Sequence, residues 1–427
     1  MIVVGAGPAG SAAALTAARA GADVVLLERG PFPGSKNVYG GVVYGRVLDD
    51  VLPGWWEEVP VQRWVTRRST MVLTEDQALT VDFRSGAWAS APYNGCTTLR
   101  ADFDAWLAGK AVEAGAHLVT STVATGLIRE DGRVVGVRTD RPDGDLRAPV
   151  VIAADGVNSF LAKEAGLLPK TDPEHLTLGV KEVLSLPRAV IDERFGVSGE
   201  HGVDIEILGC TRGVAGGGFV YTNRDSLAVG VVVSVAGLAA AKVRPEELVA
   251  DLKAHPAIAP LVRGAELKEY AAHLIPEGGY DHVPEVHHDG FLVTGDAAGL
   301  TLAAGIWLEG VNFAIGSGLA AGRAAAAAVK AGDTSRRGLS PYRKELDETF
   351  VLQDHKRLRK APELVLSDRV QQRYPGLVAD LVEGLFTVSN PTAKPGALAL
   401  LRASAKKHGV PLRHLLADGW KGARTFR

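Results

Sequence analysis

The 427-residue sequence has little cysteine, little net charge and no long apolar run. Its two cysteines, Cys96 and Cys210, are far apart and form no C-x-x-C motif, which excludes a disulfide scaffold or a four-cysteine metal site within this chain. The formal net charge of −2 at pH 7 indicates no global attraction to nucleic acid, so no such partner is expected. Because no uninterrupted apolar stretch is long enough to cross a bilayer, we expect no membrane-spanning helix.

The same features bear on location. An apolar strand starts at Ile2 and leads directly into glycine-rich sequence, so we expect no signal peptide. The scarcity of cysteine suits a reducing, cytoplasmic setting. The alanine-rich stretch 320–329 is interrupted by Gly322 and Arg323, and we expect a buried core helix there.

The first ten residues carry the most informative motif. After the apolar strand come Gly5-Ala6-Gly7-Pro8-Ala9-Gly10, a predicted helix over 11–19 and a second strand over 23–27 that ends at Glu28. In a dinucleotide-binding motif the first glycine allows a tight turn, the second lets pyrophosphate approach the backbone, and the third lets the helix pack on the strand. The helix N-terminus attracts the phosphates. The acidic residue binds a ribose hydroxyl, so this spacing predicts a dinucleotide site.

Two further segments follow predicted strands. Asp155-Gly156 comes after an apolar strand over 149–154, and Gly295-Asp296 comes after another over 290–294. A single Asp–Gly pair is more typical of a turn. Three glycine-containing segments that all follow strands predict one site instead, because ligands of open α/β sheets bind at the carboxyl ends of the strands.

The rest of the chain is organised in blocks. A helix is expected from residue 99 to near 115 with Asp102 as its N-cap, and Asp131-Gly132 indicates a hairpin turn between strands at 126–130 and 134–139. From about 176 to 284 strand-like runs dominate, which favours an inserted antiparallel sheet. From about residue 340 the pattern is helical and charged.

The three strand-end segments resemble the flavoprotein monooxygenase-type superfamily of FAD proteins. The resemblance implies FAD as the cofactor, with Glu28 on the adenosine ribose and Asp296 on the ribityl chain. It also implies that Asp155-Gly156 shapes the nucleotide cleft. Arg100, just before the Phe103-Asp104 pair at a helix start, matches the family's FAD-contacting arginine.

Other segments resemble the electron-transfer flavoprotein:quinone oxidoreductases and FixC-type proteins. They are Lys36-Asn37 with Gly40-Gly41, Gly179-Val180-Lys181-Glu182-Val183, Gly217-Gly218-Phe219-Val220-Tyr221, Leu308-Glu309-Gly310-Val311-Asn312-Phe313 and the charged segment 354–362. The resemblance implies an FAD-dependent oxidoreductase that takes electrons from electron-transfer flavoprotein subunits (FixA/FixB-like) and passes them to a quinone. The quinone oxidoreductases carry a C-terminal ferredoxin-like domain with four cysteines, which this chain lacks. That departure fits FixC, whose cluster is supplied by a small separate ferredoxin, FixX.

The resemblance also implies the architecture. We expect an α/β protein, α+β overall, with a Rossmann-like FAD-binding domain, an inserted antiparallel-sheet domain for quinone or substrate, and a helical C-terminal region. The FAD-binding domain is expected in three parts, 1–70, 99–165 and 286–335. The second domain is expected to comprise a strand segment, 71–98, and the antiparallel sheet, 166–285. The helical region is expected over 336–427.

One set of cofactor-binding residues follows from the motifs and the resemblance. Backbone N–H groups around 304–305 and 310–312 are expected near the flavin N1/C2 carbonyl, where a helix N-terminus stabilises the anionic reduced ring; close helix packing through glycine is the alternative. We predict no metal site, and no catalytic acid or base is assigned. The predicted cofactor-binding residues are Gly5, Gly7, Pro8, Ala9, Gly10, Glu28, Arg29, Asn37, Gly41, Arg100, Val123, Asp155, Gly156, Gly295, Asp296, Gly305, Gly310, Val311 and Asn312.

Two features stay open. Lys181 and Glu182 either face the flavin or a quinone headgroup, or form a surface ion pair of little energetic value. The tail from 394 to 427 carries many Lys and Arg residues, several leucines and one acidic residue, Asp418. Such a tail suits an anionic membrane surface, an acidic partner or an ordinary solvated helix face. A peripheral position on the inner face of the cell membrane therefore remains an alternative to a purely cytoplasmic one.

Other functions also fit the fold. A geranylgeranyl reductase-like enzyme would saturate prenyl double bonds in an apolar tunnel, and an aromatic hydroxylase would take electrons from NAD(P)H. A non-catalytic FAD-bearing subunit would serve assembly. If a complete Fix system accompanies this chain, the resemblance places any electron bifurcation in the flavoprotein partner.

Overall fold

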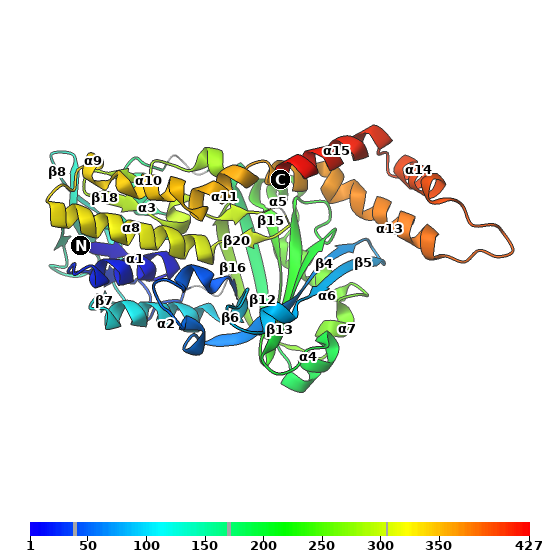
Figure 1. The fold of residues 1–427 in the computed structure, drawn as a ribbon, viewed down its shortest axis with the longest axis horizontal. Helices are drawn as coiled ribbons and strands as arrows, with labels where there is room; N and C mark the ends of the chain where they lie inside the picture. Colours follow the sequence, from blue (N-terminus) through cyan, green and yellow to red (C-terminus); the bar gives the residue numbers. More distant parts are fainter. Residues whose placement is uncertain (37–40, 169–171, 305) are drawn as a thin grey trace.

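The computed structural model describes residues 1–36, 41–168, 172–304 and 306–427. One end of the molecule is built around a six-stranded sheet in the order β17-β18-β11-β1-β2-β7 (Figure 1). The five parallel strands are short and almost wholly apolar, as expected for a parallel sheet covered on both faces. They are β1 (Ile2–Val4), β2 (Val25–Leu27), β7 (His117–Val119), β11 (Val151–Ala153) and β18 (Phe291–Val293), with β17 (His287–His288) antiparallel at the edge.

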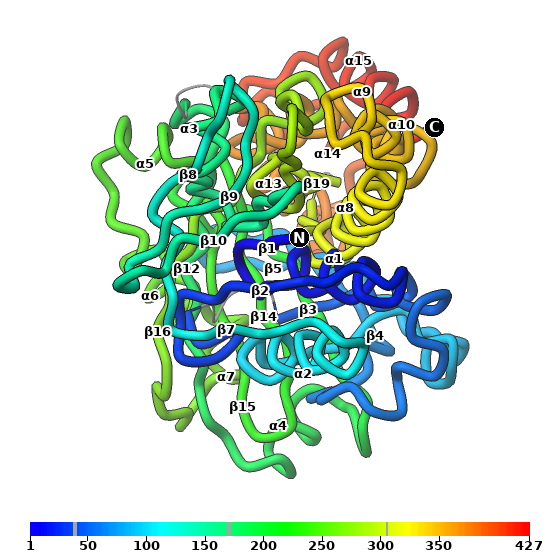
Figure 2. Tube along the Cα trace, turned by 90° about the vertical axis from the view of Figure 1, so that its left-hand side faces the viewer, coloured from blue at the N-terminus to red at the C-terminus, as the bar shows by residue number. Residues whose placement is uncertain are grey.

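Helices and a small sheet cover the two faces. Helices α1 (Pro8–Arg19), α2 (Arg100–Glu113) and α8 (Val311–Ala331) lie on one side, and the three-stranded sheet β8 (Ala124–Glu130), β9 (Arg133–Thr139) and β10 (Leu146–Arg147) lies on the other (Figure 2). Strands β8 and β9 are joined by Asp131 and Gly132, whose φ angles are 49° and 81°. Positive φ at both positions is what a tight hairpin turn needs, so this predicted hairpin is confirmed.

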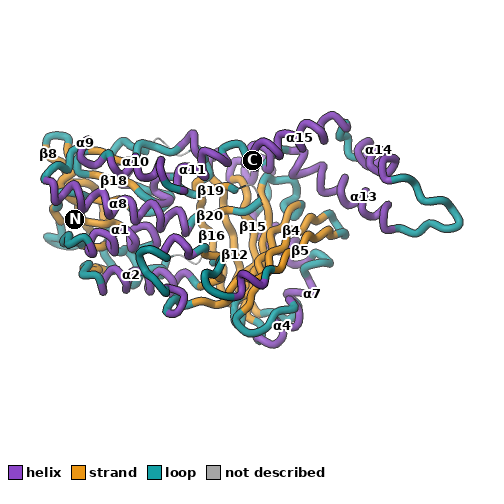
Figure 3. The backbone as a smooth tube through the Cα atoms, viewed as in Figure 1, coloured by secondary structure: helices purple, strands orange, loops and turns teal. Residues whose placement is uncertain are grey.

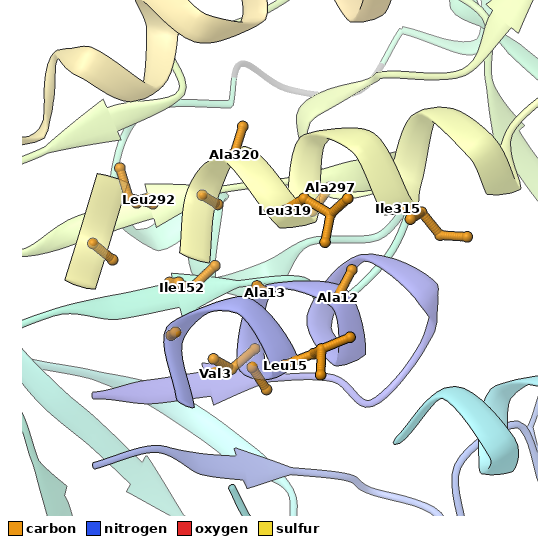
Figure 4. Close-up of a cluster of buried hydrophobic side chains, with 14 of the residues drawn as sticks. Val3, Ala12, Ala13, Leu15, Ile152, Leu292, Ala297, Ile315, Leu319 and Ala320 are labelled. Carbon is orange, nitrogen blue, oxygen red and sulfur yellow. The ribbon is translucent and has the colours of Figure 1, made fainter. Parts of the chain in front are cut away.

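Helices α1 and α8 touch through small residues, as the cluster in Figure 4 shows. A Cβ on Gly318 would lie 2.1 Å from the Ala9 carbonyl oxygen, and a Cβ on Gly322 would lie 2.4 Å from that of Ala13. The alanine-rich stretch is therefore a buried core helix, as predicted, and its composition sets how closely the two helix backbones approach.

Helix α2 lies where the sequence predicts a helix, but its N-cap differs from the predicted one. Its N-cap is Leu99, and Asp102 lies in the first turn with its N–H donating to the Leu99 carbonyl at 3.1 Å. The predicted Asp102 cap is therefore wrong. Arg100 already belongs to the first turn of the helix and forms an ion pair with Asp104 four residues later.

The second large element is a nine-stranded sheet, mostly antiparallel, in the order β16-β12-β15-β14-β13-β4-β6-β3, with β5 beside β4. Strands β13 and β4 pair in parallel. One face forms a separate apolar core under α4 (Arg188–Phe195), α5 (Val235–Ala241), α6 (Pro245–Ala254) and α7 (Ala259–Val262). Its strands are β3 (Val42–Val43), β4 (Val61–Leu73), β5 (Ala78–Arg84), β6 (Cys96–Thr98), β12 (Leu176–Ser185), β13 (His201–Leu208), β14 (Gly216–Thr222), β15 (Ser226–Ser234) and β16 (Glu266–Pro276).

The fold class matches the expectation of a nucleotide-binding α/β unit, an inserted antiparallel sheet and a helical C-terminal region (Figure 3). The domain limits at 70, 98, 165, 285 and 335 remain predictions.

Within the described ranges, no helix combines the length and apolarity needed to span a membrane. The remaining elements are α3 (Phe160–Glu164), β19 (Leu302–Ala303), β20 (Leu308–Glu309), α9 (Arg336–Leu339), α10 (Pro341–Glu348), α11 (Phe350–Leu358), α12 (Ala361–Val365), α13 (Tyr374–Phe386), α14 (Ala397–Lys407) and α15 (Leu412–Thr425).

Candidate active site

The strand order of the parallel sheet reverses between β1 and β11, because the chain moves from β1 to β2 on one side and places β11 and β18 on the other. Ligands of such sheets bind in the crevice at this switch point. A cavity of about 680 Å³ lies there and is lined by residues that follow β1, β11 and β18. The three segments singled out in the sequence therefore meet at one site.

The glycines after β1 have distinct steric surroundings. Gly5 has φ +100°, and a Cβ on it would lie 2.3 Å from the Ala154 carbonyl oxygen. A Cβ on Gly10 would lie 1.8 Å from the Gly5 carbonyl oxygen, whereas a Cβ on Gly7 would have nothing within 4 Å. Gly7 lines the cavity. The first and third glycines thus allow close backbone packing, and the second leaves space for a ligand at the start of α1.

Glu28 is buried at the end of β2 and holds the motif together. Its Oε2 accepts a hydrogen bond from the Ala6 N–H at 3.1 Å, and its Oε1 accepts one from the Gly30 N–H at 2.7 Å. A carboxylate has about four acceptor positions, so these two bonds leave capacity for a ligand hydroxyl. Glu28 also lines the cavity, as a ribose-binding residue must.

Arg100 and Asp104 form a buried ion pair at the cavity wall. The Arg100 Nε and Nη2 each lie 2.8 Å from one carboxylate oxygen of Asp104. Burial raises the pKa of Asp104, and the facing guanidinium of Arg100 opposes that rise. This paired geometry fixes the orientation of Arg100, because two parallel hydrogen bonds leave the guanidinium little rotational freedom.

Asp155 and Asp296 follow β11 and β18 and both line the cavity. Asp155 accepts a hydrogen bond from the Ser159 hydroxyl at 2.8 Å and one from the Leu161 N–H at 3.3 Å, and burial raises its pKa. Asp296 accepts one from the Thr301 hydroxyl at 3.3 Å. Both carboxyl groups are therefore oriented by neighbouring residues of their own turns.

The remaining predicted residues divide into three groups. Pro8, Ala9, Arg29, Gly41, Val123, Gly156, Gly310 and Val311 line the cavity with those described above. Gly10, Gly295 and Asn312 do not line the cavity. A Cβ on Gly295 would be 2.7 Å from the Ala9 Cβ, and the Asn312 amide donates to Glu309 at 2.7 Å. Asn37 and Gly305 lie outside the described residues.

Lys181 and Glu182 point to opposite faces of β12. Lys181 is buried with its Nζ 3.5 Å from the Tyr221 hydroxyl, and burial lowers its pKa to about 8. Glu182 forms an ion pair with Lys253 of α6 at 2.5 Å. The alternative interpretation, a surface ion pair between Lys181 and Glu182, is therefore wrong. Lys181 instead lies behind Tyr221, which lines the cavity.

The cavity is also lined by residues that are not in the predicted cofactor-binding set. Its apolar wall comes from the nine-stranded sheet, from the segment before β20 and from the C-terminal helices. A polar group, Arg68 with Asp204 and Glu206, lies in the same wall beside Tyr44. The apolar lining residues include Leu208, Phe219, Val232, Trp307, Val365 and Leu366.

Comparison with known proteins agrees with this geometry. The family described as "FAD dependent oxidoreductase" matches residues 1–167. The chain is 41% identical over 426 residues to a probable electron transfer flavoprotein-quinone oxidoreductase, YdiS, of Escherichia coli K12, covering 100% of this chain and 98% of that protein. It is 38% identical over 431 residues to FixC of Bradyrhizobium diazoefficiens, with the same coverages. The chain belongs to the FixC and electron transfer flavoprotein-quinone oxidoreductase family.

A solved structure supports the same fold. The geranylgeranyl bacteriochlorophyll reductase-like protein of Thermoplasma acidophilum superposes with a TM-score of 0.73 at 23% identity, covering 98% of each chain. The family match and the identity to YdiS and FixC make the protein an FAD-dependent oxidoreductase of the FixC type. The open space beside Gly7, the oriented Glu28 carboxylate and the buried Arg100 pair fit FAD. In the part of the chain that the structure describes, no group of three or more His, Cys, Asp or Glu residues is placed to hold a metal ion.

Proposed function

We propose that this enzyme accepts electrons from an electron-transfer flavoprotein and passes them through FAD to a quinone. The observation that carries the proposal is the continuity of the cavity, which runs from the nucleotide motif at Gly7 to an apolar wall that includes Trp307 and Leu366. The polar part suits the nucleotide. The apolar part suits a planar, lipid-soluble acceptor, since ligand pockets are mostly apolar with a few placed polar groups.

The chain's own residues have separate roles in this proposal. Glu28 holds the adenosine ribose, the N-terminus of α1 faces the pyrophosphate, and Asp296 holds the ribityl chain. The N-terminus of α8, at Gly310 and Val311, lies at the cavity and favours negative charge there. FAD, when bound, supplies the two-electron chemistry, and the protein orients it and limits access of water.

Partners are part of the proposal. An electron-transfer flavoprotein of the FixA/FixB kind is the proposed donor, as the name of the YdiS relative suggests for that protein. With two cysteines in the sequence, an iron–sulfur cluster with four cysteine ligands would have to come from another chain. A small FixX-like ferredoxin is the proposed source.

The helices α13 to α15 and their connecting loops form a projecting C-terminal arm (Figure 1). Its single acidic residue after 394, Asp418, is held by Arg369 at 2.7 and 2.8 Å and by the Tyr374 hydroxyl at 2.5 Å. The arm also carries exposed apolar side chains, and this combination with basic residues supports peripheral attachment to an anionic membrane surface. The exposed apolar residues of the arm are Leu385, Phe386, Val388, Leu398, Leu416, Trp420 and Phe426.

The donor specificity tests the proposal. Under anaerobic conditions, chemically reduced electron-transfer flavoprotein should bleach the FAD absorbance, while NADH or NADPH alone should not. Fast bleaching by NAD(P)H alone would indicate a hydroxylase or a directly reduced enzyme instead. Oxidation of the reduced enzyme by a prenyl substrate rather than a quinone would indicate a prenyl reductase, and no turnover with any acceptor would indicate an assembly subunit.

A further inference from the structure

The wall of the cavity contains two carboxyl groups on one strand. Asp204 and Glu206 are two residues apart on β13, so both point to the same face, while Val203, Ile205 and Ile207 point into the apolar core on the other face. Both carboxyl side chains are buried, with exposed fractions of 7% and 11%. They therefore face the ligand cavity rather than solvent.

One arginine is shared between them. Arg68 of β4 lies beside Asp204 in the parallel register, with its Nε 3.6 Å from Asp204 Oδ2 and its Nη2 hydrogen-bonded to Glu206. The guanidinium also lies 5.2 Å from the ring centroid of Trp307 and 5.7 Å from that of Tyr44. A single positive charge thus faces two carboxyl groups in a wall of low polarity.

The charge balance of this group favours one retained proton. Two buried carboxylates that interact directly cannot both ionise easily beside one cation. Burial, together with repulsion from Glu206, raises the pKa of Asp204 well above the ordinary value of an aspartate despite Arg68. The other titratable groups around the pair are Tyr44, Tyr221, which is the cross-strand partner of Asp204, and Glu309 near Tyr44. Burial raises the pKa of both tyrosines, so they are weaker acids than Asp204.

We propose that Asp204 is a catalytic acid that donates a proton to the bound quinone, with Glu206 and Arg68 as positioning residues that hold it protonated and oriented. The proposal rests on the proposed quinone reduction. The O–H bond of the Asp204 carboxyl breaks, and an O–H bond forms at one quinone carbonyl oxygen. The two electrons and the second proton come from reduced FAD. The Asp204 carboxylate then regains a proton from water.

Another cavity carboxyl group is placed less suitably for this role. Glu277 follows β16, which three strands separate from β13 in the sheet order, and it accepts a hydrogen bond from the Thr177 hydroxyl at 2.6 Å. The pair on β13 instead adjoins the aromatic part of the wall at Trp307 and Tyr44. A planar acceptor bound in this part of the cavity would lie beside the carboxyl pair.

The test compares two oxidants of the reduced enzyme. A water-soluble short-chain quinone needs protons, while ferricenium accepts single electrons without protons. Asp204→Asn should slow the oxidation of enzyme by the quinone by about 100-fold at pH 7, the range of general acid catalysis, and leave the ferricenium rate unchanged. Glu206→Gln should slow the quinone reaction less and shift its pH profile. Glu182→Gln, on the other face of the sheet, is the matched control.

The pH dependence gives a second readout. The wild-type quinone reaction should slow as the pH rises through the raised pKa of Asp204, above the range of an ordinary carboxyl group, because Asp204 then loses its proton, and this decline should vanish in Asp204→Asn. In the oxidised enzyme, the infrared C=O stretch of a protonated carboxyl group should titrate over the same range in wild type and Glu182→Gln. It should be missing in Asp204→Asn.

Several outcomes would overturn the assignment. Asp204→Asn with a wild-type quinone rate and pH profile would exclude Asp204 as the acid. Equal losses with quinone and ferricenium would indicate a structural role. A wild-type enzyme that reacts with ferricenium and with no quinone would overturn the proposed function itself. Failure of the proposed function can therefore be told apart from failure of the Asp204 assignment, because the wild-type enzyme alone reveals it.

Discussion

The carbonyl oxygen of Gly5 lies 1.8 Å from the position that a Cβ on Gly10 would occupy. The turn after β1 and the first turn of α1 are therefore in contact through backbone alone. At Gly7, between them, a Cβ would have nothing within 4 Å. The motif thus contains two glycines that the fold requires, Gly5 and Gly10, and one, Gly7, that the fold leaves open beside the cavity.

This difference predicts two separable phenotypes. Gly10→Ala should destabilise the protein by about 3 kcal/mol, the upper end of the usual range for overpacking, because backbone must move to accept the methyl group. Gly7→Ala should leave the apoprotein about as stable as wild type and weaken FAD retention at least tenfold, because its methyl group occupies the ligand's space. Urea unfolding of apoprotein and FAD content after gel filtration measure the two effects. If Gly7→Ala and Gly10→Ala changed the unfolding free energy and the FAD content equally, the two glycines would not have these separate roles.

Substitutions of Asp296 and Glu28 should also differ in their effects on FAD retention and on apoprotein stability. Asp296→Ala removes a cavity carboxylate that receives one hydrogen bond, from Thr301, so FAD retention should fall with little loss of apoprotein stability. Glu28→Ala leaves the N–H groups of Ala6 and Gly30 without their acceptor, which costs about 1–3 kcal/mol per buried group. Differential scanning fluorimetry of apoprotein and flavin fluorescence of the purified variants separate the effects. Full flavin occupancy in both variants would refute the site assignment.

Glu277 predicts a pH dependence of stability. Burial raises its pKa to about 7 from the ordinary value of 4.5. The folded state therefore retains a proton that the unfolded state loses, so this contribution to the free energy of unfolding declines as the pH rises from about 4.5 through 7. The decline should be about 3 kcal/mol, and Glu277→Gln should remove it.

The measurement is urea unfolding of wild type and variant at a series of pH values. Glu174→Gln, at a nearby exposed carboxylate, serves as the control and should run parallel to wild type. A Glu277→Gln curve that also runs parallel would show that the Glu277 carboxyl titrates equally in both states.

The C-terminal arm predicts binding to anionic vesicles. Leu416 and Trp420 lie one turn apart on α15 and are 77% and 62% exposed. Replacing both by serine should reduce sedimentation with phosphatidylglycerol vesicles at least fivefold and leave FAD content unchanged. Leu267→Ser, an exposed leucine on β16, is the control. Binding that is absent in wild type, or equal in all three proteins, would contradict membrane attachment.

Much of the nucleotide end could be predicted from sequence, because its signals are local. Glycines at Gly5, Gly7 and Gly10 and the acidic Glu28 have fixed spacings that follow from backbone geometry. The hairpin at Asp131-Gly132 is local in the same way. The Asp102 cap failed because a preference for capping residues does not fix the helix start: the helix already begins at Arg100, and its N-cap, Leu99, makes no side-chain capping hydrogen bond.

The part of the cavity wall around Arg68 and Trp307 could not be predicted, because its residues come together only in the folded chain. Arg68 and Asp204 are far apart in sequence and meet through the parallel pairing of β4 with β13. The alternation of Asp204 and Glu206 with apolar neighbours is typical of a strand with one solvent-facing side. Here that polar side lines a cavity, and only the arrangement of the whole sheet distinguishes the two cases.

The central claim is tested most directly by oxidising the reduced enzyme with a quinone. Enzyme reduced anaerobically by electron-transfer flavoprotein, with and without the FixX-like ferredoxin, is mixed with a short-chain quinone while FAD absorbance is followed. The account predicts return of the oxidised flavin spectrum with one hydroquinone formed per FAD. Flavin that stays reduced with quinone under both conditions, yet reoxidises with ferricenium, would contradict it.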